Sequence, residues 1–215
     1  MNLDVSKFIS PANWIISGMT GSGKTYWLFK LLQNKTHLFI TPPKKVLYCY
    51  SVWQPLFDQM EQELGVTFLK GIPSEQDILQ FAGDKGDHNL ICLDDLQQDV
   101  VNNKVIEKLF TQFCHHHCIS VIFINQNLFY QGKCSRTLSL NTYYTVLLKN
   151  QRNLQQISLL GRQIGKAKLL IEAYKDVIAK PFGYLILDLC PQTDTDIQIR
   201  SHIFPDESPI VVYKD

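Results

Sequence analysis

Two hydrophobic periodicities alternate along the chain. Runs of consecutive apolar residues, each about as long as one buried strand, are separated by segments in which apolar residues recur every three or four positions. The apolar runs predict strands at residues 14–17, 45–51, 66–69, 89–95, 120–125, 143–149 and 184–189. The segments between them predict helices over 24–34, 54–64, 102–117, 152–160 and 165–179, with one more helix after Pro73 and Ser74.

Strands with few polar residues that alternate with helices are typical of a parallel sheet whose two faces are both covered. The sequence therefore predicts an α/β fold with three layers. The 215 residues suit a single domain, with a core of about 8–190 and a C-terminal segment of about 191–215. That segment alternates loosely and indicates either an edge strand or a contact with a neighbouring molecule.

The first strand leads directly into a glycine-rich turn and a helix, in the stretch WIISGMTGSGKTYWLFKLL at residues 14–32. Gly18, Gly23, Lys24 and Thr25 occupy the fixed positions of the phosphate-binding pattern G-x-x-x-x-G-K-[ST], and both flanking elements agree with it. Glycines let the backbone wrap around an anion, and the positive end of the helix adds to the attraction. An ordinary turn is the alternative, but the agreement at every fixed position favours nucleotide binding.

The loop predicts a nucleotide-binding set in which Lys24 reaches the β- and γ-phosphates and the Thr25 hydroxyl is a magnesium ligand. The set comprises Gly18, Thr20, Gly21, Ser22, Gly23, Lys24 and Thr25.

Two consecutive carboxylates end the buried strand NLICLDD, and the first of them, Asp94, follows Lys24 by seventy residues. Asp94 would belong to the magnesium shell, and Asp95 would orient and polarise the attacking water. A helix cap is the alternative for two acids considered alone. Behind a phosphate-binding loop, the pair favours hydrolysis over mere binding.

The next strand, in SVIFINQN, ends in Asn125, Gln126 and Asn127. The carboxyl ends of parallel strands share one edge, so an amide there can hydrogen-bond to the γ-phosphate or to the water. A turn-forming cluster of amides is the alternative. We select Gln126 as the candidate.

Arginines matter because the transition state of phosphoryl transfer carries charge on the γ-phosphoryl oxygens. Arg136 follows YQGKCS, which we expect to be an exposed polar loop, and it is the first choice. Arg152 and Arg162 are rivals that a solvent-exposed or ion-paired position explains equally well, and Arg200 is the remaining arginine.

The overall charge gives no sign of a nucleic-acid or membrane partner, because the formal net charge is only +1. Between residues 149 and 180, seven basic side chains stand against two acidic ones. This segment can follow a phosphate backbone, although a solvated helix face explains it about as well. The longest apolar runs are far below the roughly 20 residues of a membrane span, so we expect no membrane crossing.

The six cysteines are scattered and no signal peptide precedes them, which predicts a reduced, intracellular and soluble protein. In the stretch CHHHC, Cys114 and Cys118 share one helical face, as two zinc ligands can. Three adjacent histidines point in different directions on a helix, however, and an apolar strand follows. A polar helix end with Cys118 facing the core is the preferred interpretation.

Six segments in order carry a family resemblance: NWIISGMTGSGKT, NLICLDD, ISVIFINQNLFYQGK, SRTLSLNTYYTVLLKNQRN, LGRQ and PFGYLILDL. Together they resemble the genome-packaging ATPases of the FtsK/HerA superfamily from large and mid-sized double-stranded DNA viruses. Those of adintoviruses and of the related Maverick/Polinton elements look most similar. The resemblance covers roughly residues 8–205, and its specific part is the QNLFYQGK to SRTLSLN block together with LGRQ.

The resemblance implies an additional-strand RecA-like ATPase that uses ATP and Mg²⁺, assembles as a homo-oligomeric ring and drives double-stranded viral DNA into a preformed capsid. Partners would be DNA, read without sequence preference, and capsid vertex proteins, in the nucleus or at a cytoplasmic assembly site of an infected cell. The loops at 97–104 or 129–136 would face the DNA.

The resemblance also assigns residues. Lys24, Thr25, Asp94 and Asp95 match the Walker positions, and Gln126 matches the polar sensor on a strand between the two Walker strands. Arg136 is the position for an arginine finger supplied by a neighbouring subunit, with Arg152 second. The second Walker acid, Asp95, is Asp where many relatives have Glu, which shortens its reach to water.

Other functions remain open from the sequence. One is another DNA translocase or a helicase-like ATPase, and one is a nucleotide-dependent switch or assembly factor with little turnover. Another is a small P-loop kinase of nucleosides or nucleotides, but such kinases usually carry an arginine-rich lid and do not need two acids at a strand end.

Overall fold

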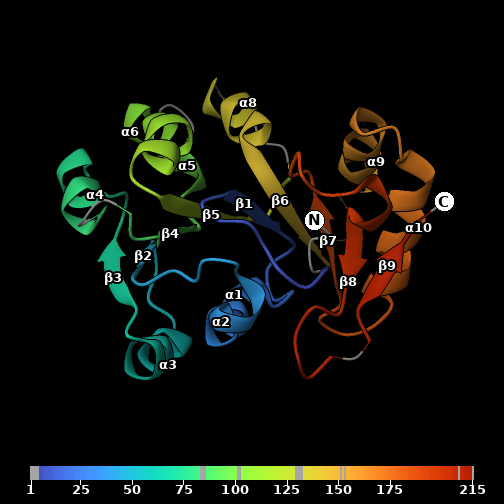
Figure 1. Ribbon diagram of the computed structural model, residues 1–215, viewed down its shortest axis with the longest axis horizontal. Helices are drawn as coiled ribbons and strands as arrows, with labels where there is room; N and C mark the ends of the chain where they lie inside the picture. The colour runs from blue at the N-terminus through green and yellow to red at the C-terminus, as the bar shows by residue number, and fades with distance from the viewer. Residues whose placement is uncertain are drawn as a thin grey trace.

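The computed structural model describes residues 5–82, 86–100, 103–128, 133–150, 152, 154–207 and 209–214. Within these residues one sheet has the strand order β3-β2-β4-β5-β1-β6-β7-β8-β9 (Figure 1). Its strands are β1 (Asn13–Ser17), β2 (Val46–Tyr50), β3 (Thr67–Lys70), β4 (Asn89–Asp94), β5 (Ile119–Asn125), β6 (Thr142–Leu148), β7 (Tyr184–Asp188), β8 (Ile199–Ser201) and β9 (Val211–Tyr213). The strands predicted from the apolar runs are thus confirmed.

The strands from β3 to β6 pair in parallel, as expected. Strand β5 lies between β1 and β4, and its residue Phe123 pairs with Ile15 on one side and with Leu93 on the other. The carboxyl ends of β1, β4 and β5 therefore meet at one edge, as in the expected additional-strand arrangement.

The other end of the sheet differs from the expectation of parallel strands throughout, because β7, β8 and β9 pair in an antiparallel manner. Two helices, α9 (Leu154–Gln163) and α10 (Ala167–Ile178), connect β6 to β7. A single helix returns the chain to the edge where a strand began, but a helical pair brings it back to the edge where the strand ended. Strand β7 therefore starts beside the end of β6, with Tyr184 opposite Leu148.

Helices cover both faces of the sheet (Figure 1). On one face lie α1 (Lys24–Gln33), α2 (Lys35–Leu38) and α3 (Pro55–Leu64), which pack on Trp14, Ile16 and Tyr48. The other face carries α4 (Glu75–Ala82), α5 (Gln97–Val100), α6 (Lys104–Lys108), α7 (Cys114–His116), α8 (Lys133–Leu140), α9 and α10. There, Ile15 packs against the α9 and α10 side chains, because successive residues of a strand point to opposite faces.

The helix expected over 102–117 is interrupted. A π-helical turn, η1 (Leu109–Phe113), separates α6 from α7. The side chain of Asn13 on β1 donates a hydrogen bond to the Phe110 carbonyl oxygen at 2.9 Å, and a side chain that bonds into the helical ladder favours such a bulge. The start signal at Pro73 and Ser74 is confirmed, since the Ser74 hydroxyl accepts a hydrogen bond from the Asp77 amide at 3.2 Å before α4.

The C-terminal segment forms edge strands, which agrees with one of its two expected roles. It contributes a short 3₁₀ helix, η2 (Thr195–Ile197), and strands β8 and β9. Arg200 on β8 and Asp188 on β7 form a buried ion pair with a nitrogen–oxygen distance of 2.8 Å, and the guanidinium lies over the Phe8 ring. In the described part of the chain, no helix combines the length and the apolar character that a membrane span requires.

Candidate functional site

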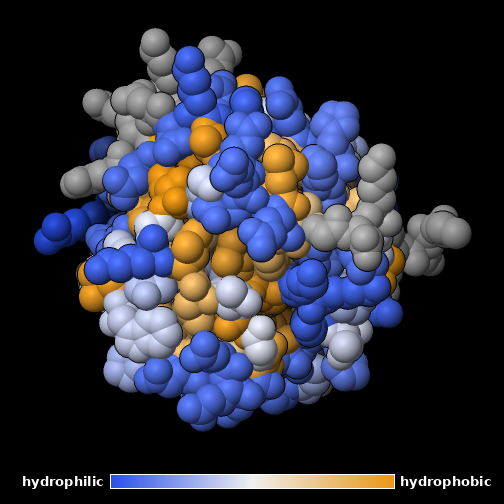
Figure 2. All heavy atoms as spheres, turned by 90° about the vertical axis from the view of Figure 1, so that its left-hand side faces the viewer, coloured by the Kyte–Doolittle hydropathy of each residue, from blue (hydrophilic) through white to orange (hydrophobic). Residues whose placement is uncertain are grey.

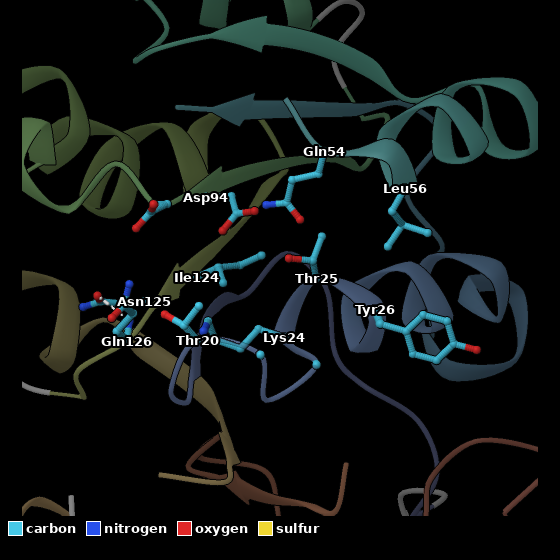
Figure 3. Close-up of a pocket in the computed structure, with 13 residues that line it drawn as sticks. Thr20, Lys24, Thr25, Tyr26, Gln54, Leu56, Asp94, Ile124, Asn125 and Gln126 are labelled. Atoms are coloured by element: carbon cyan, nitrogen blue, oxygen red, sulfur yellow. Dashed lines mark hydrogen bonds between the residues drawn. The ribbon is translucent and has the colours of Figure 1, made fainter. Parts of the chain in front are cut away.

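The carboxyl ends of β1, β4 and β5 border a pocket with a volume of about 350 Å³ (Figure 3). The predicted site residues that line it are Thr20, Gly21, Gly23, Lys24, Thr25, Asp94, Asp95 and Gln126. Although Lys24 and Asp94 are seventy residues apart, they share this pocket because the parallel strands that precede them end at the same edge. Gly18 and Ser22 lie in the same loop but do not line the pocket.

The loop between β1 and α1 has the backbone of a phosphate cradle. Gly21 and Gly23 have φ values of 76° and 93°, in the left-handed region that glycine adopts without strain. Gly23 is the N-cap of α1 and provides no side-chain cap, so the first amides of the helix are left for a ligand. At Gly18 a Cβ atom would lie 2.5 Å from the Ser22 Oγ atom, so these two residues pack against each other inside the loop.

Lys24 lies across its own loop. Its ammonium nitrogen donates hydrogen bonds to the Gly18 and Met19 carbonyl oxygens at 2.7 and 3.0 Å. Burial lowers the pKa of Lys24, and the carboxylates of Asp94 and Asp95 oppose that shift. Figure 3 shows Thr25 between Lys24 and Asp94, so the cation and the two predicted magnesium ligands surround one space.

Asp94 is buried, and its Oδ2 atom accepts a hydrogen bond from the hydroxyl of Tyr48 at 2.7 Å. Burial raises the pKa of Asp94, the Tyr48 hydrogen bond lowers it, Asp95 raises it and Lys24 lowers it. The structure therefore adds Tyr48, which the sequence analysis missed.

Asp95 differs from its neighbour. It is exposed, it lines the pocket and its φ of 54° lies in the left-handed region, which is uncommon for a residue other than glycine. The two acids at the end of β4 thus occupy distinct environments, one buried and one facing solvent. This division agrees with the separate tasks that we expect for a metal ligand and for a residue that activates water.

The three amides that follow β5 also separate. The Asn125 side chain is used locally, since its Nδ2 atom donates to the Asn127 carbonyl oxygen and its Oδ1 atom accepts from the Gln126 amide, both at 2.7 Å. Gln126 is exposed and lines the pocket. Asn125 lines the pocket as well, so the choice of Gln126 stays a prediction.

Two further pocket residues are Gln54, in the connection between β2 and α3, and Leu56, in the first turn of α3. Figure 3 shows the Gln54 amide directed toward Asp94. The sequence analysis missed them, although the signal was available. A residue that follows a parallel strand at its carboxyl end is placed at the binding edge, and Gln54 lies four residues beyond β2.

The arginines whose side chains are described lie outside the lining of the pocket. Arg152 and Arg162 are exposed and do not line it, and Arg200 is held in its buried ion pair. We expected a loop before Arg136, and its second half is wrong because α8 begins at Lys133. Residues 129–132 and the Arg136 side chain lie outside the described residues. The other expected loop, 97–104, contains helix α5 and the start of α6, with 101–102 outside the described residues.

A second hollow, with a volume of about 600 Å³, adjoins the phosphate pocket and shares Gly23 and Tyr26 with it. One wall is the flank of α1, with Tyr26, Trp27 and Lys30, and Phe182 lies on another wall. Phe182 is 68% exposed, has a φ of 58° and holds its ring 2.9 Å from the position of a Cβ atom on Gly23. An aromatic hollow therefore begins where the phosphate cradle ends.

The CHHHC stretch gives no metal site in the described part of the chain, where no three His, Cys, Asp or Glu side chains gather around one point. Cys114 is buried, and burial raises the pKa of its thiol to about 12. Cys118, which we expected to face the core, is half-buried with a φ of 51°.

Comparison with known proteins identifies the family. The sequence matches the family model described as "Poxvirus A32 protein" over residues 5–181, and no curated protein sequence matches the chain. The genome packaging NTPase B204 from Sulfolobus turreted icosahedral virus 2, solved in complex with ATP-gammaS, has a similar fold with a TM-score of 0.51 and 12% identity, over 99% of this chain and 98% of that chain. The N-terminal domain of zonular occludens toxin from Neisseria meningitidis gives a TM-score of 0.40 and 10% identity, over 66% of this chain and 79% of that chain. The chain therefore belongs to the poxvirus A32 protein family, and its resemblance to viral genome-packaging ATPases of the FtsK/HerA type is confirmed.

Proposed function

We propose that this protein is an ATP-hydrolysing motor that moves double-stranded viral DNA into a preformed capsid. The observation that carries the proposal is the shared pocket, in which a phosphate-binding loop, two strand-end carboxylates and a sensor amide face one another. The fold is that of a packaging NTPase solved with an ATP analogue, which supports ATP as the nucleotide.

Magnesium fits the donors that the pocket offers. The Thr25 hydroxyl and the Asp94 carboxylate are oxygen ligands, and both belong to the same pocket lining. Thr25 and Asp94 would hold Mg²⁺, which would neutralise part of the charge of the phosphates. Lys24 provides the complementary positive charge from the loop, and the open amides at the start of α1 bind the phosphate oxygens.

Water activation falls to the exposed members of the pocket. Asp95 has the solvent access that a base needs, and Gln126, which lines the same pocket, would hydrogen-bond to the γ-phosphate or to the water. The adenine base would enter the aromatic hollow, because that hollow begins at Gly23 and Tyr26, at the end of the phosphate cradle. The ring faces of Tyr26 and Phe182 offer stacking surfaces there.

A ring would supply what a single subunit lacks. In the described part of the chain no arginine lines the pocket, so the transition-state charge calls for a guanidinium from elsewhere, and Arg136 of a neighbouring subunit is our candidate. Figure 2 shows hydrophobic side chains gathered in the middle of the face at the β3 end of the sheet. Trp53, whose ring packs on Phe68 of β3, is 43% exposed, its neighbour Val52 is 69% exposed, and the two directly precede the pocket residue Gln54. A neighbouring subunit that packs here would reach the nucleotide.

The test measures ATP hydrolysis against protein concentration, with and without long double-stranded DNA. We expect a steep concentration dependence, stimulation by DNA, loss of turnover in Lys24→Ala and suppression of the wild-type protein when Arg136→Ala is mixed into it. Turnover that is independent of concentration and DNA would contradict the motor. Phosphate transfer to a nucleoside or nucleotide would instead indicate the kinase alternative.

A further inference from the structure

The hydroxyl of Tyr48 binds a side chain from a neighbouring strand. It donates a hydrogen bond to the Asp94 Oδ2 atom at the end of β4, with an oxygen–oxygen distance of 2.7 Å. Tyr48 itself lies on β2 and has no exposed surface. One buried hydroxyl thus holds a carboxylate that the proposed function assigns to the metal ion.

The direction of this hydrogen bond follows from the inventory of hydrogens. A phenol has one hydrogen, and Tyr48 gives it to Asp94, which as a carboxylate can only accept. The hydrogen bond therefore ends on the negative charge, and such charge-assisted bonds are stronger than those between neutral groups.

This arrangement leaves Asp94 able to bind a cation. Asp94 keeps its Oδ1 atom and part of Oδ2 for a ligand, since one bond to Oδ2 uses only some of the carboxylate's acceptor positions.

The core around the ring fixes where the hydroxyl lies. The Tyr48 ring packs against Phe57 and Phe68, with centroid distances of 4.9 and 5.3 Å, and those two rings stack on each other. Strand β2 lies next to β4 in the sheet, with Tyr48 opposite Cys92, two residues before Asp94. A group locked by packing in this way can hold metal ligands in a set geometry.

We propose that Tyr48 is a positioning residue that orients Asp94 toward the magnesium ion of bound Mg²⁺·ATP. This inference rests on the proposed function. The alternative is a purely structural role, in which the Tyr48 ring fills the core and its hydroxyl hydrogen-bonds to the nearest acceptor. The two differ in one respect: only a positioning role makes the effect of the hydroxyl depend on the metal.

The experiment compares Tyr48→Phe with the wild-type protein in binding a fluorescent ATP analogue, once with Mg²⁺ and once with a chelator. Phenylalanine keeps the ring packing and removes only the hydroxyl. We expect about tenfold weaker binding with Mg²⁺, unchanged binding without it, and a Mg²⁺ concentration for half-maximal binding that is raised by about tenfold. Tyr50→Phe on the same strand, whose ring packs on Phe57 and Phe68 too, is the matched control and should leave all three values unchanged.

Equal loss of affinity with and without Mg²⁺, or no change at all in Tyr48→Phe, would overturn the inference. Lys24→Ala separates this failure from that of the proposed function. If Lys24→Ala abolishes nucleotide binding while Tyr48→Phe leaves the Mg²⁺ requirement unchanged, the nucleotide site stands and only the role of Tyr48 falls. If Lys24→Ala binds and hydrolyses ATP normally, the proposed site itself is wrong.

Discussion

Two buried carboxylates, each at the carboxyl end of a strand, are stabilised in different ways at the two ends of the sheet. Asp188 on β7 forms an ion pair with Arg200, and both side chains are almost completely buried. Asp94 on β4 is held by the neutral hydroxyl of Tyr48 and faces the pocket. A carboxylate paired within the fold has no charge left for a ligand, whereas one held by a hydroxyl keeps its attraction for a cation at a cost in stability. The antiparallel end is therefore the structural end, and the parallel end carries the chemistry.

The largest expected effect concerns the structural end. Arg200→Met leaves the Asp188 carboxylate buried without its partner, and we expect a loss of about 3–5 kcal/mol in the free energy of unfolding. Urea denaturation followed by circular dichroism measures it. The double variant Arg200→Met with Asp188→Leu, which removes both charges, should recover most of the loss. A stability loss below about 1 kcal/mol in the single variant would show that the ion pair does not hold this end together.

The complementary variant at the parallel end is Asp94→Asn. Asparagine keeps the size and an oxygen for the Tyr48 hydroxyl but removes the charge, so ATP hydrolysis should fall by roughly a hundredfold or more. Because burial raises the pKa of Asp94 in the folded protein, the ionised carboxylate costs stability at neutral pH, and the variant should unfold at the same urea concentration or a higher one. Asp94→Asn with full activity and lower stability would reverse the comparison.

The same contrast explains what the sequence could predict. Parallel strands and the phosphate loop were predictable because apolar runs, glycine positions and strand-end acids are local patterns. The antiparallel pairing of β7 with β6 depends on how α9 and α10 pack as a pair. The π-helical turn depends on a hydrogen bond from Asn13, which lies about a hundred residues before η1 in the sequence. Neither leaves a local signal.

The site shows the same limit. Recognisable motifs contain Lys24, Thr25 and Asp94. Because parallel strands end at the same edge of the sheet, the sequence could predict that these residues lie close together. Tyr48 looks like any other residue of a buried strand. The one available clue was its hydroxyl, since a buried tyrosine needs a hydrogen-bond partner, but only the structure shows that this partner is Asp94.

The phosphate pocket and the aromatic hollow, which meet at Gly23, can be compared in the same way, as the polar part and the apolar part of one ligand site. We expect Tyr26→Ala and Phe182→Ala each to weaken ATP binding by about tenfold, since stacking between a base and an aromatic side chain is worth about 1–3 kcal/mol. Binding of inorganic tripolyphosphate should remain unchanged, because it occupies the phosphate cradle alone. Isothermal titration calorimetry measures both ligands.

Leu140→Ala is the control for this pair, since Leu140 is 74% exposed and lies outside both hollows. If the Tyr26 and Phe182 variants lost affinity for tripolyphosphate to the same extent as for ATP, the aromatic hollow would not be the site of the base.

The smallest expected effect lies at the other end of β4, where His88 precedes the strand that ends in Asp94. His88 is buried, with Nδ1 at 2.7 Å from the Thr41 carbonyl oxygen and Nε2 at 2.7 Å from the Ser120 Oγ atom. A carbonyl oxygen can only accept, so Nδ1 carries the hydrogen and Nε2 accepts from Ser120, which is the pattern of a neutral ring. Burial accordingly lowers the pKa of His88.

The sign of the pH dependence follows from that shift. The unfolded chain, with a histidine pKa of about 6.5, binds a proton at a higher pH than the folded protein does, so stability is present above about pH 6.5 and is lost as the pH falls toward the folded pKa. Between pH 7.5 and 5.5, the wild-type protein should lose up to about 1 kcal/mol more unfolding free energy than His88→Asn does. His37→Asn, at an exposed position, should keep the wild-type dependence. If the unfolding free energy depended on pH equally in all three proteins, His88 would titrate in the folded state as it does in the unfolded chain. Burial of this histidine at the amino end of β4 would then contribute nothing to the pH dependence of stability.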